Sequence, residues 1–251
     1  MILQFPHLSL DVTVTTQFRN DLFQTPLWVG SVGDSDLIES SQQLARQFRD
    51  QPGEKGLVSD SWSKGETSDD LDTQNKKGVT SFYSENLVAN SDWDLNLTKL
   101  VDAAGGMLLD THPPEMIKGM RMANAWVTIY PQGGFVPEHI HAGFWVSGVF
   151  YAKAEKGCGD IAFKDPGWLA KAMAMHTNTV GSFPGPPSSY NYSPVTGDIL
   201  LFPSWLPHHT LPNESGEDRI IVSFNLIFPK QAEYHSDIGL ALQQKGQEND
   251  S

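Results

Sequence analysis

The sequence predicts a mainly β protein whose short strands form a sandwich or jelly roll, with helices added near the N-terminus. From Lys118 onward, short apolar segments alternate with turns rich in Gly, Pro and Asp. Two of these segments nearly repeat each other, Gly159–Phe163 and Gly197–Phe202, and each is a Gly-Asp turn that leads into an apolar strand. Before Lys118, two stretches show the 3.6-residue spacing of apolar side chains that is typical of amphipathic helices.

The first 117 residues are expected to support the sheet. Alternating apolar side chains predict a strand over residues 8–14, and a second short strand is predicted over 23–29, where a proline indicates a sheet edge. Helices are predicted over 34–49 and 97–108, and both are expected to cover one face of the sheet. Residues 51–75 are polar and weakly patterned, which favours a surface loop or a partly disordered segment.

Residues 118–230 are expected to form the jelly-roll core. The predicted strands are 122–130, 145–152, 159–163, 197–202 and 220–228. Residues 167–193 interrupt them and are rich in Pro, Gly, Ser and Met, so they are predicted to form a lid. Residues 231–251 are predicted to be a polar tail. The whole chain, 1–251, is predicted to be a single domain.

Composition excludes several classes of function. The 251 residues carry a formal net charge of -13, and this acidity argues against nucleic-acid binding, which needs a basic surface. No apolar run is long enough to span a membrane, and the N-terminus lacks the pattern of a signal peptide. The single cysteine, Cys158, allows no intramolecular disulfide, so a cytoplasmic location is predicted. The sequence is compatible with a homodimer.

Four histidines suggest a metal site. His139 and His141 stand two residues apart, and on a β-strand this spacing places both side chains on one face. A third imidazole, from His208 or His209, follows an apolar strand that a rolled double sheet can bring alongside. Three protein ligands that leave coordination positions free are typical of metals that activate oxygen or water. An H-x-H pair alone is weak evidence, because histidines near turns are often only surface residues.

The sequence around these histidines resembles the 2-oxoglutarate- and iron(II)-dependent dioxygenases, in particular a branch with an H-x-H…H pattern. Three blocks carry the resemblance in order: HIHAGFWVSGVFYAKAEKGCGDIAFKDP, GDILLFPSWLPHH and DRIIVSFN. The resemblance covers about residues 123–228, and residues 23–29 resemble the F-x-TP opening of the same branch. The resemblance implies a double-stranded β-helix, iron(II) and 2-oxoglutarate as cofactors, and a hydroxylation that releases succinate and carbon dioxide.

The resemblance also implies roles for individual residues. His139, His141 and His208 would be the catalytic iron ligands. His208 is favoured over His209 because it aligns with the single histidine that follows FPSWL in that branch. Most of the superfamily has H-x-D or H-x-E, so His141 stands where a carboxylate is usual. The nearby carboxylate Glu138 is expected to point to the opposite face of the strand.

The cosubstrate site is implied in the same way. Arg219, which follows His208 as His208-x10-Arg219, would bind the far carboxylate of 2-oxoglutarate. Tyr130, nine residues before the first histidine, would add a hydroxyl donor. Ser223 would assist, although the usual R-x-S serine position holds Ile221 here. The substrate to be hydroxylated is not identified by the sequence.

Two alternatives remain open at this point. One is a cupin-like three-histidine metal dioxygenase that does not use 2-oxoglutarate and has no need of Arg219. The other is a non-enzymatic jelly-roll binding protein, in which the histidines hold a structural zinc ion or no metal.

Overall fold

A computed structural model describes residues 24–50, 56–57, 78–167 and 189–228. Four predicted features lie wholly or mostly outside these ranges: the strand at 8–14, the loop at 51–75, most of the lid at 167–193 and the tail at 231–251.

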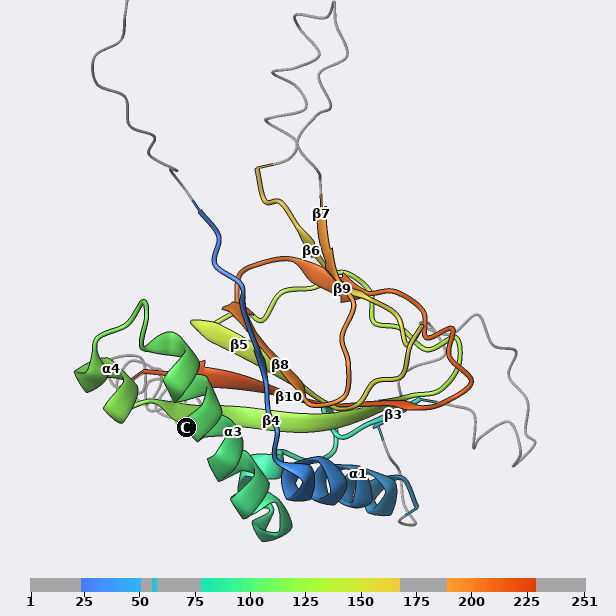
Figure 1. The fold of residues 1–251 in the computed structure, drawn as a ribbon. Coiled ribbons are helices and arrows are strands. Elements are labelled where there is room, and N and C mark those ends of the chain that lie inside the picture. Colours follow the sequence, from blue (N-terminus) through green and yellow to red (C-terminus); the bar gives the residue numbers. More distant parts are fainter. Residues whose placement is uncertain (1–23, 51–55, 58–77, 168–188, 229–251) are drawn as a thin grey trace, which may run out of the picture.

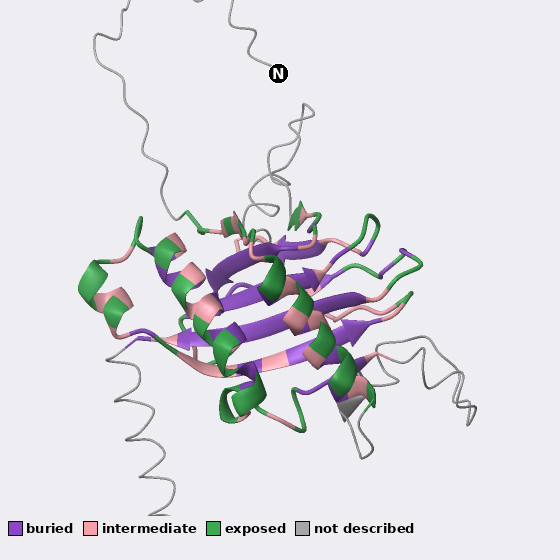
Figure 2. Cartoon of the chain, turned by 60° about the horizontal axis from the view of Figure 1, so that its bottom comes forward, coloured by how far each residue is buried: buried purple, intermediate pink, exposed green. Residues whose placement is uncertain are grey.

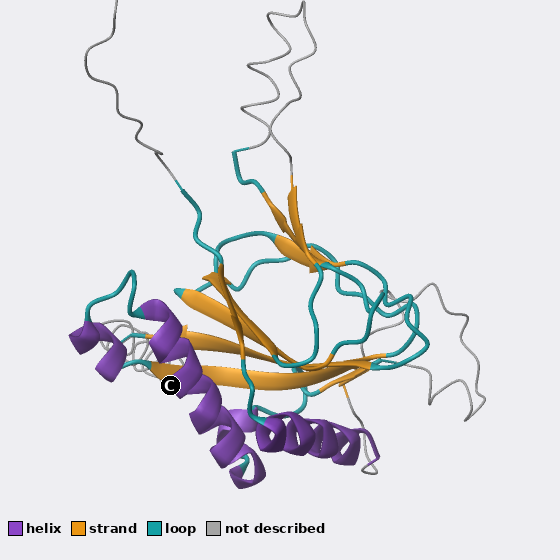
Figure 3. Ribbon diagram, viewed as in Figure 1, coloured by secondary structure: helices purple, strands orange, loops and turns teal. Residues whose placement is uncertain are grey.

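Two antiparallel sheets face each other (Figures 1 and 3). The larger sheet has the strand order β1-β8-β5-β10-β4-β3-β2, and the smaller has the order β7-β6-β9. The strands are β1 (Trp28–Ser31), β2 (Gly56–Leu57), β3 (Val79–Thr80), β4 (Arg121–Tyr130), β5 (Val146–Lys153), β6 (Ile161–Lys164), β7 (Ser189–Tyr192), β8 (Asp198–Pro203), β9 (His208–Thr210) and β10 (Arg219–Ile227). This architecture confirms the mainly β jelly roll.

The helices lie against the outer face of the larger sheet, as predicted (Figures 1 and 2). They are α1 (Ser35–Asp50), α3 (Asp94–Leu108), α4 (Pro114–Lys118) and the short 3₁₀ helices η1 (Leu87–Ala89) and η2 (Ser91–Trp93). Helix α1 begins where the sequence predicts, because the Asp34 carboxylate accepts a hydrogen bond of 2.9 Å from the Leu37 N–H. No helix of the described ranges is long and apolar enough to cross a membrane.

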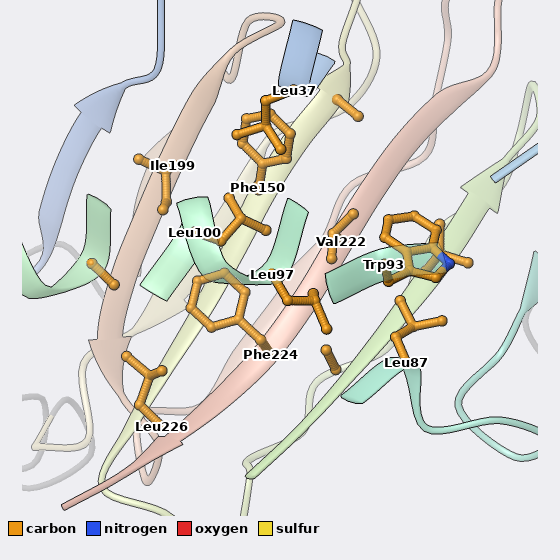
Figure 4. Close-up of a cluster of buried hydrophobic side chains, with 14 of the residues drawn as sticks. Leu37, Leu87, Trp93, Leu97, Leu100, Phe150, Ile199, Val222, Phe224 and Leu226 are labelled. Carbon is orange, nitrogen blue, oxygen red and sulfur yellow. The ribbon is translucent and has the colours of Figure 1, made fainter. Parts of the chain in front are cut away.

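The main core fills the space between these helices and the larger sheet (Figure 4). Alternation along β10 supplies one row of it, and these residues are Ile220, Val222, Phe224 and Leu226. The Phe224 ring crosses the neighbouring strand at Gly148, where an added Cβ would lie 2.2 Å from a ring carbon. Only glycine therefore fits at Gly148 while the ring keeps this position.

The prediction of a lid is wrong for its C-terminal end. Residues 189–192 were assigned to the lid on composition, but they form β7, which pairs with β6. The two tyrosines of this strand, Tyr190 and Tyr192, give it β propensity that the surrounding Pro, Gly and Ser residues obscure in the sequence.

Candidate metal centre and cavity

A cavity of about 400 Å³ lies between the two sheets. Strand alternation creates it, because the residues of β10 that do not enter the main core face the opposite way. Ile221, Ser223 and Asn225 line the cavity from β10, and the paired strand β4 contributes Trp126 and other side chains of the same face. The cavity therefore occupies the inside of the roll, and its position follows from the period of two along each strand.

Three imidazoles meet at this cavity. The ligand nitrogens of His139, His141 and His208 all lie within 4.8 Å of one another. The Nε2 atoms of His139 and His141 are 3.2 Å apart, and the ring centroids of His139 and His208 are 4.3 Å apart. Such a group of nitrogen atoms is compatible with a single divalent ion.

The backbone brings the distant histidines together. His139 and His208 form a β-bridge in which each N–H donates to the other's carbonyl, at 3.0 and 3.1 Å. The His141 N–H donates to the Ser204 carbonyl at 2.8 Å, so the chain before β5 runs antiparallel to the chain around β9. These main-chain bonds hold the rings in place through secondary structure.

Each ring is also fixed by its other nitrogen. Nδ1 of His139 donates to the Pro137 carbonyl and Nδ1 of His208 to the Leu206 carbonyl, both at 2.8 Å. Nδ1 of His141 donates to the amide oxygen of Asn225 at 2.7 Å. Because these oxygens only accept, each ring carries its proton on Nδ1, and the Nε2 lone pair is left for a metal.

Burial keeps the three rings in the form that binds metals. It is the main cause that lowers the pKa of His141 to about 4 and that of His208 to about 3, and it also lowers the pKa of His139. The rings are therefore neutral at pH 7, and metal binding displaces no proton from them. The donor set fits an iron(II) ion, because neutral imidazoles are ordinary ligands for that metal.

Asn225 is a residue of the site that the sequence did not indicate. Its amide oxygen accepts from both His141 and the Ser147 hydroxyl, each at 2.7 Å, and its amide nitrogen donates to the Asn124 side chain at 2.8 Å. The Ser147 hydroxyl is also 2.7 Å from that of Ser204. This buried network orients the amide, and the amide orients the His141 ring.

The other candidate ligands do not join the group. His209, the alternative to His208, follows it on β9 and alternates to the other face. Glu138 forms an ion pair of 3.2 Å with Lys164. Asp160 accepts a hydrogen bond from the Ser193 hydroxyl at 2.6 Å. In the part of the chain that the structure describes, no carboxylate belongs to the histidine group.

Arg219 is wholly buried, with 0% of its surface exposed, but it does not line the cavity. Its Nη1 donates to the carbonyls of Cys158 (2.7 Å), Gly159 (3.2 Å) and Leu211 (3.4 Å), and its Nη2 donates to the Thr210 hydroxyl at 3.0 Å. Gly159 makes this cradle possible, since its φ is +90° and an added Cβ would lie 2.3 Å from the Leu211 oxygen.

The positive charge of Arg219 has no anionic partner among the described residues. No ion pair involves it, and its buried Nε has no hydrogen-bond partner. Its guanidinium carbon lies 4.4 Å from the centre of the Tyr130 ring, a cation–π contact. A buried cation without a counterion is costly, so an anion that approaches this end of the cavity is attracted.

Three residues that carry hydroxyl groups line the cavity near Arg219. Tyr130, Tyr151 and Thr210 all line it, and burial raises the pKa of both tyrosines, so they remain proton donors. The Thr210 oxygen accepts from Arg219 and from the Val136 N–H at 3.0 Å, which leaves its own proton for another acceptor. The sequence indicated Tyr130, whereas Tyr151 is hidden in the uniformly apolar run of β5.

Ser223, the remaining predicted residue, lines the cavity and is 8% exposed. It lies on the same face of β10 as Ile221 and Asn225, between the Arg219 end and the histidines. Its assistance to cosubstrate binding stays a prediction.

The chain is similar to 2-oxoglutarate-dependent oxygenases in one family comparison and in structural comparisons. Residues 124–225 match a family described as "Putative 2OG-Fe(II) oxygenase". No curated protein matches the chain. A prolyl-4-hydroxylase structure from Pseudomonas putida is 16% identical with a TM-score of 0.51, and the match covers 80% of this chain and 92% of that one. The α-ketoglutarate-dependent epimerase SnoN from nogalamycin biosynthesis is 11% identical with a TM-score of 0.54, covering 81% and 78% respectively. At these identities the two structures establish the fold alone.

Proposed function

We propose that this protein, whose segment 124–225 matches the 2OG-Fe(II) oxygenase family, is an iron(II)- and 2-oxoglutarate-dependent oxygenase that hydroxylates a substrate still to be identified. The observation that carries the proposal is the convergence of three Nε2 lone pairs inside a jelly roll of that family. Iron(II) with 2-oxoglutarate and dioxygen would supply the oxidation when bound: one oxygen atom goes to succinate as carbon dioxide is released, and the other goes to the hydroxylated product.

The residues His139, His141 and His208 would hold the metal. All three are neutral ligands, so the bound ion keeps its full positive charge, whereas a carboxylate ligand would cancel part of it. An uncancelled charge favours anionic ligands, and 2-oxoglutarate is a dianion. The all-imidazole set is therefore compatible with the cosubstrate, and the protein's part is to orient these rings and keep them unprotonated.

The opposite end of the cosubstrate would lie toward Arg219. Thr210 and Tyr151 offer hydroxyl donors on the cavity wall, and Arg219 supplies positive charge behind Thr210. Hydrogen bonds from these groups to a carboxylate gain strength because the surroundings are buried and of low dielectric constant. The guanidinium would thus act through the Thr210 hydroxyl, or directly after a small movement of its side chain.

The test is anaerobic titration of the iron(II)-loaded protein with 2-oxoglutarate, followed by the charge-transfer absorption of the complex. Arg219→Met, Thr210→Val and Tyr151→Phe should each weaken binding of 2-oxoglutarate. Arg46→Met is the matched control, because Arg46 is exposed on α1 and donates to the Gln42 side chain of the same helix at 2.9 Å. If none of the three cavity variants changes the affinity, the assignment of this end to the cosubstrate is wrong.

A cupin-like three-histidine dioxygenase remains the second candidate. It is favoured by one observation, that Arg219 is cradled by carbonyls and does not line the cavity. This candidate predicts that Arg219→Met leaves activity intact and that 2-oxoglutarate is not consumed. Measurement of succinate in a reaction with oxygen, iron(II) and 2-oxoglutarate separates the two functions.

Other expectations complete the proposal. The single domain over 1–251, with its divisions at 1–117, 118–230 and 231–251, remains a prediction, as do the cytoplasmic location, the absence of nucleic-acid binding and the optional homodimer. Size-exclusion chromatography with light scattering would test the last of these.

A further inference from the structure

Three aromatic side chains form a path from the surface to the histidines. Phe82 makes edge-to-face contacts with Tyr83 and Trp126, with ring centroids 4.9 and 5.0 Å apart. Trp126 in turn lies 5.5 Å from the His141 ring. We call Phe82, Tyr83 and Trp126 the mouth cluster. All three line the cavity, so the cluster connects solvent with the candidate metal centre.

The outer rings of the mouth cluster are exposed, and they lie on a turn whose backbone is hydrogen-bonded. Phe82 is 51% exposed and Tyr83 is 69% exposed. Their turn is fixed by hydrogen bonds from the Phe82 N–H to the Thr80 hydroxyl (3.3 Å) and from the Val127 N–H to the Ser81 hydroxyl (3.2 Å). Large exposed rings on a hydrogen-bonded turn offer apolar surface for a ligand, and the ordered backbone reduces the conformational entropy lost on binding.

The cavity wall carries no formal charge. No Asp, Glu, Lys or Arg of the described ranges lines it, and its polar side chains are hydroxyl, amide and neutral imidazole groups. A cationic group that entered next to the mouth cluster would lose its hydration without gaining a counterion. The aromatic walls and neutral polar groups suit an uncharged ring that carries at most a hydroxyl or carbonyl substituent.

The size of the cavity limits the ligand further. Its volume of about 400 Å³ is near the lower end of the range for small-molecule sites, roughly 300–1,000 Å³. Under the proposed function the same space also holds 2-oxoglutarate. The remaining room at the mouth suits one ring system.

We propose that the mouth cluster binds the uncharged aromatic ring of a small-molecule substrate and holds it beside His141. The identification of that ligand as the substrate rests on the proposed function, whereas the binding of the ring does not. Phe82 and Tyr83 expose aromatic surface at the mouth, so a flat ligand gains aromatic contacts that a saturated one lacks.

The test is ligand-observed NMR with the full-length, zinc-loaded protein and three probes: indole, cyclohexanol and tryptamine. Indole is expected to bind most tightly. Phe82→Ala and Tyr83→Ala are each expected to weaken indole binding by roughly 2- to 10-fold, whereas Tyr83→Phe should retain it. Tyr190→Ala is the matched control, since Tyr190 is 58% exposed on β7 and does not line the cavity.

Four outcomes would overturn the proposal: no binding of indole, equal binding of cyclohexanol, tighter binding of the cationic tryptamine, or indole binding that is indifferent to Phe82 and Tyr83. Because both side chains are largely exposed, their loss is not expected to prevent folding, and thermal melting checks this.

A separate measurement distinguishes failure of the ring site from failure of the proposed metal site. Cobalt(II) in place of zinc(II) should broaden the indole resonances through proximity to the histidines. If indole binding depends on the mouth cluster but cobalt(II) has no effect, the ring site stands and the metal assignment fails.

Discussion

Replacing Asn225 with leucine should weaken metal binding without removing any metal ligand. In the structure the Asn225 amide oxygen fixes His141 through a hydrogen bond of 2.7 Å to Nδ1. Without that acceptor, the ring loses the partner that sets its tautomer and orientation. Loss of such an outer partner typically weakens metal affinity by about 10- to 100-fold.

The cost in stability can be worked out from the same network. Asn225 makes three side-chain hydrogen bonds, to His141, Ser147 and Asn124, with lengths of 2.7, 2.7 and 2.8 Å. Each contributes about 1 kcal/mol net, so Asn225→Leu should lower the free energy of unfolding by about 2–4 kcal/mol. The metal-free protein should show this loss as well.

The assay is competition between the protein and a chromophoric chelator for cobalt(II) or zinc(II). Asn96→Leu is the matched control, because Asn96 is 4% exposed and bonds to Ser41 in the helical layer, far in the fold from the histidines. It should lower stability and leave metal affinity unchanged. Equal metal affinity of the Asn225→Leu and wild-type proteins would refute the idea that this amide positions His141.

Three further predictions concern the core, the cavity and pH. Gly148→Ala should lower the free energy of unfolding by about 1–3 kcal/mol in urea denaturation, because its methyl group meets the Phe224 ring; an unchanged midpoint would contradict this. Thr210→Val should raise the Kd for 2-oxoglutarate roughly tenfold without changing metal affinity, as one hydrogen bond to a charged group is lost. The metal-free protein should lose stability as pH falls from about 6.5 toward 3. Burial lowers the pKa of His141 to about 4 and that of His208 to about 3. In this pH range the unfolded chain therefore binds protons that the folded chain does not. A melting temperature that is constant between pH 7 and 4.5 would count against it.

The strands and helices that pack in regular patterns were predictable from the sequence. The strand predicted over 122–130 is β4, and the helix predicted over 34–49 is α1, each within one residue at either end. In both elements the apolar side chains recur at a regular spacing, because one face of the element packs against the core. The three-residue strand β9 was not predicted, because its pairing with β6 is set by chain that lies far away in the sequence.

The histidines of the candidate site were predictable from local sequence patterns, whereas other residues of the site were not. His139 and His141 stand out because their spacing is local, and His208 follows a recognisable strand. Asn225 and Tyr151 are inconspicuous in sequence, since each lies in a strand that is buried on both faces. Only the alternation of side chains in the folded sheet shows which of these residues face the cavity.

Arg219 illustrates a further limit. The family resemblance implied a cation near the histidines but not its surroundings, which are three carbonyls, the Thr210 hydroxyl and the Tyr130 ring. Those contacts come from two loops and from two strands, β9 of the smaller sheet and β4 beside β10, which meet only after folding. The structure therefore adds Thr210 as an intermediary between the guanidinium and the cavity.

The most direct measurement is anomalous diffraction at the iron edge from crystals grown without oxygen in the presence of iron(II) and 2-oxoglutarate. We expect a single strong peak bonded to Nε2 of His139, His141 and His208, with the far carboxylate of 2-oxoglutarate at the Thr210–Arg219 end. An iron peak elsewhere, or a peak at the three rings with 2-oxoglutarate absent from the cavity at saturating concentration, would contradict the account.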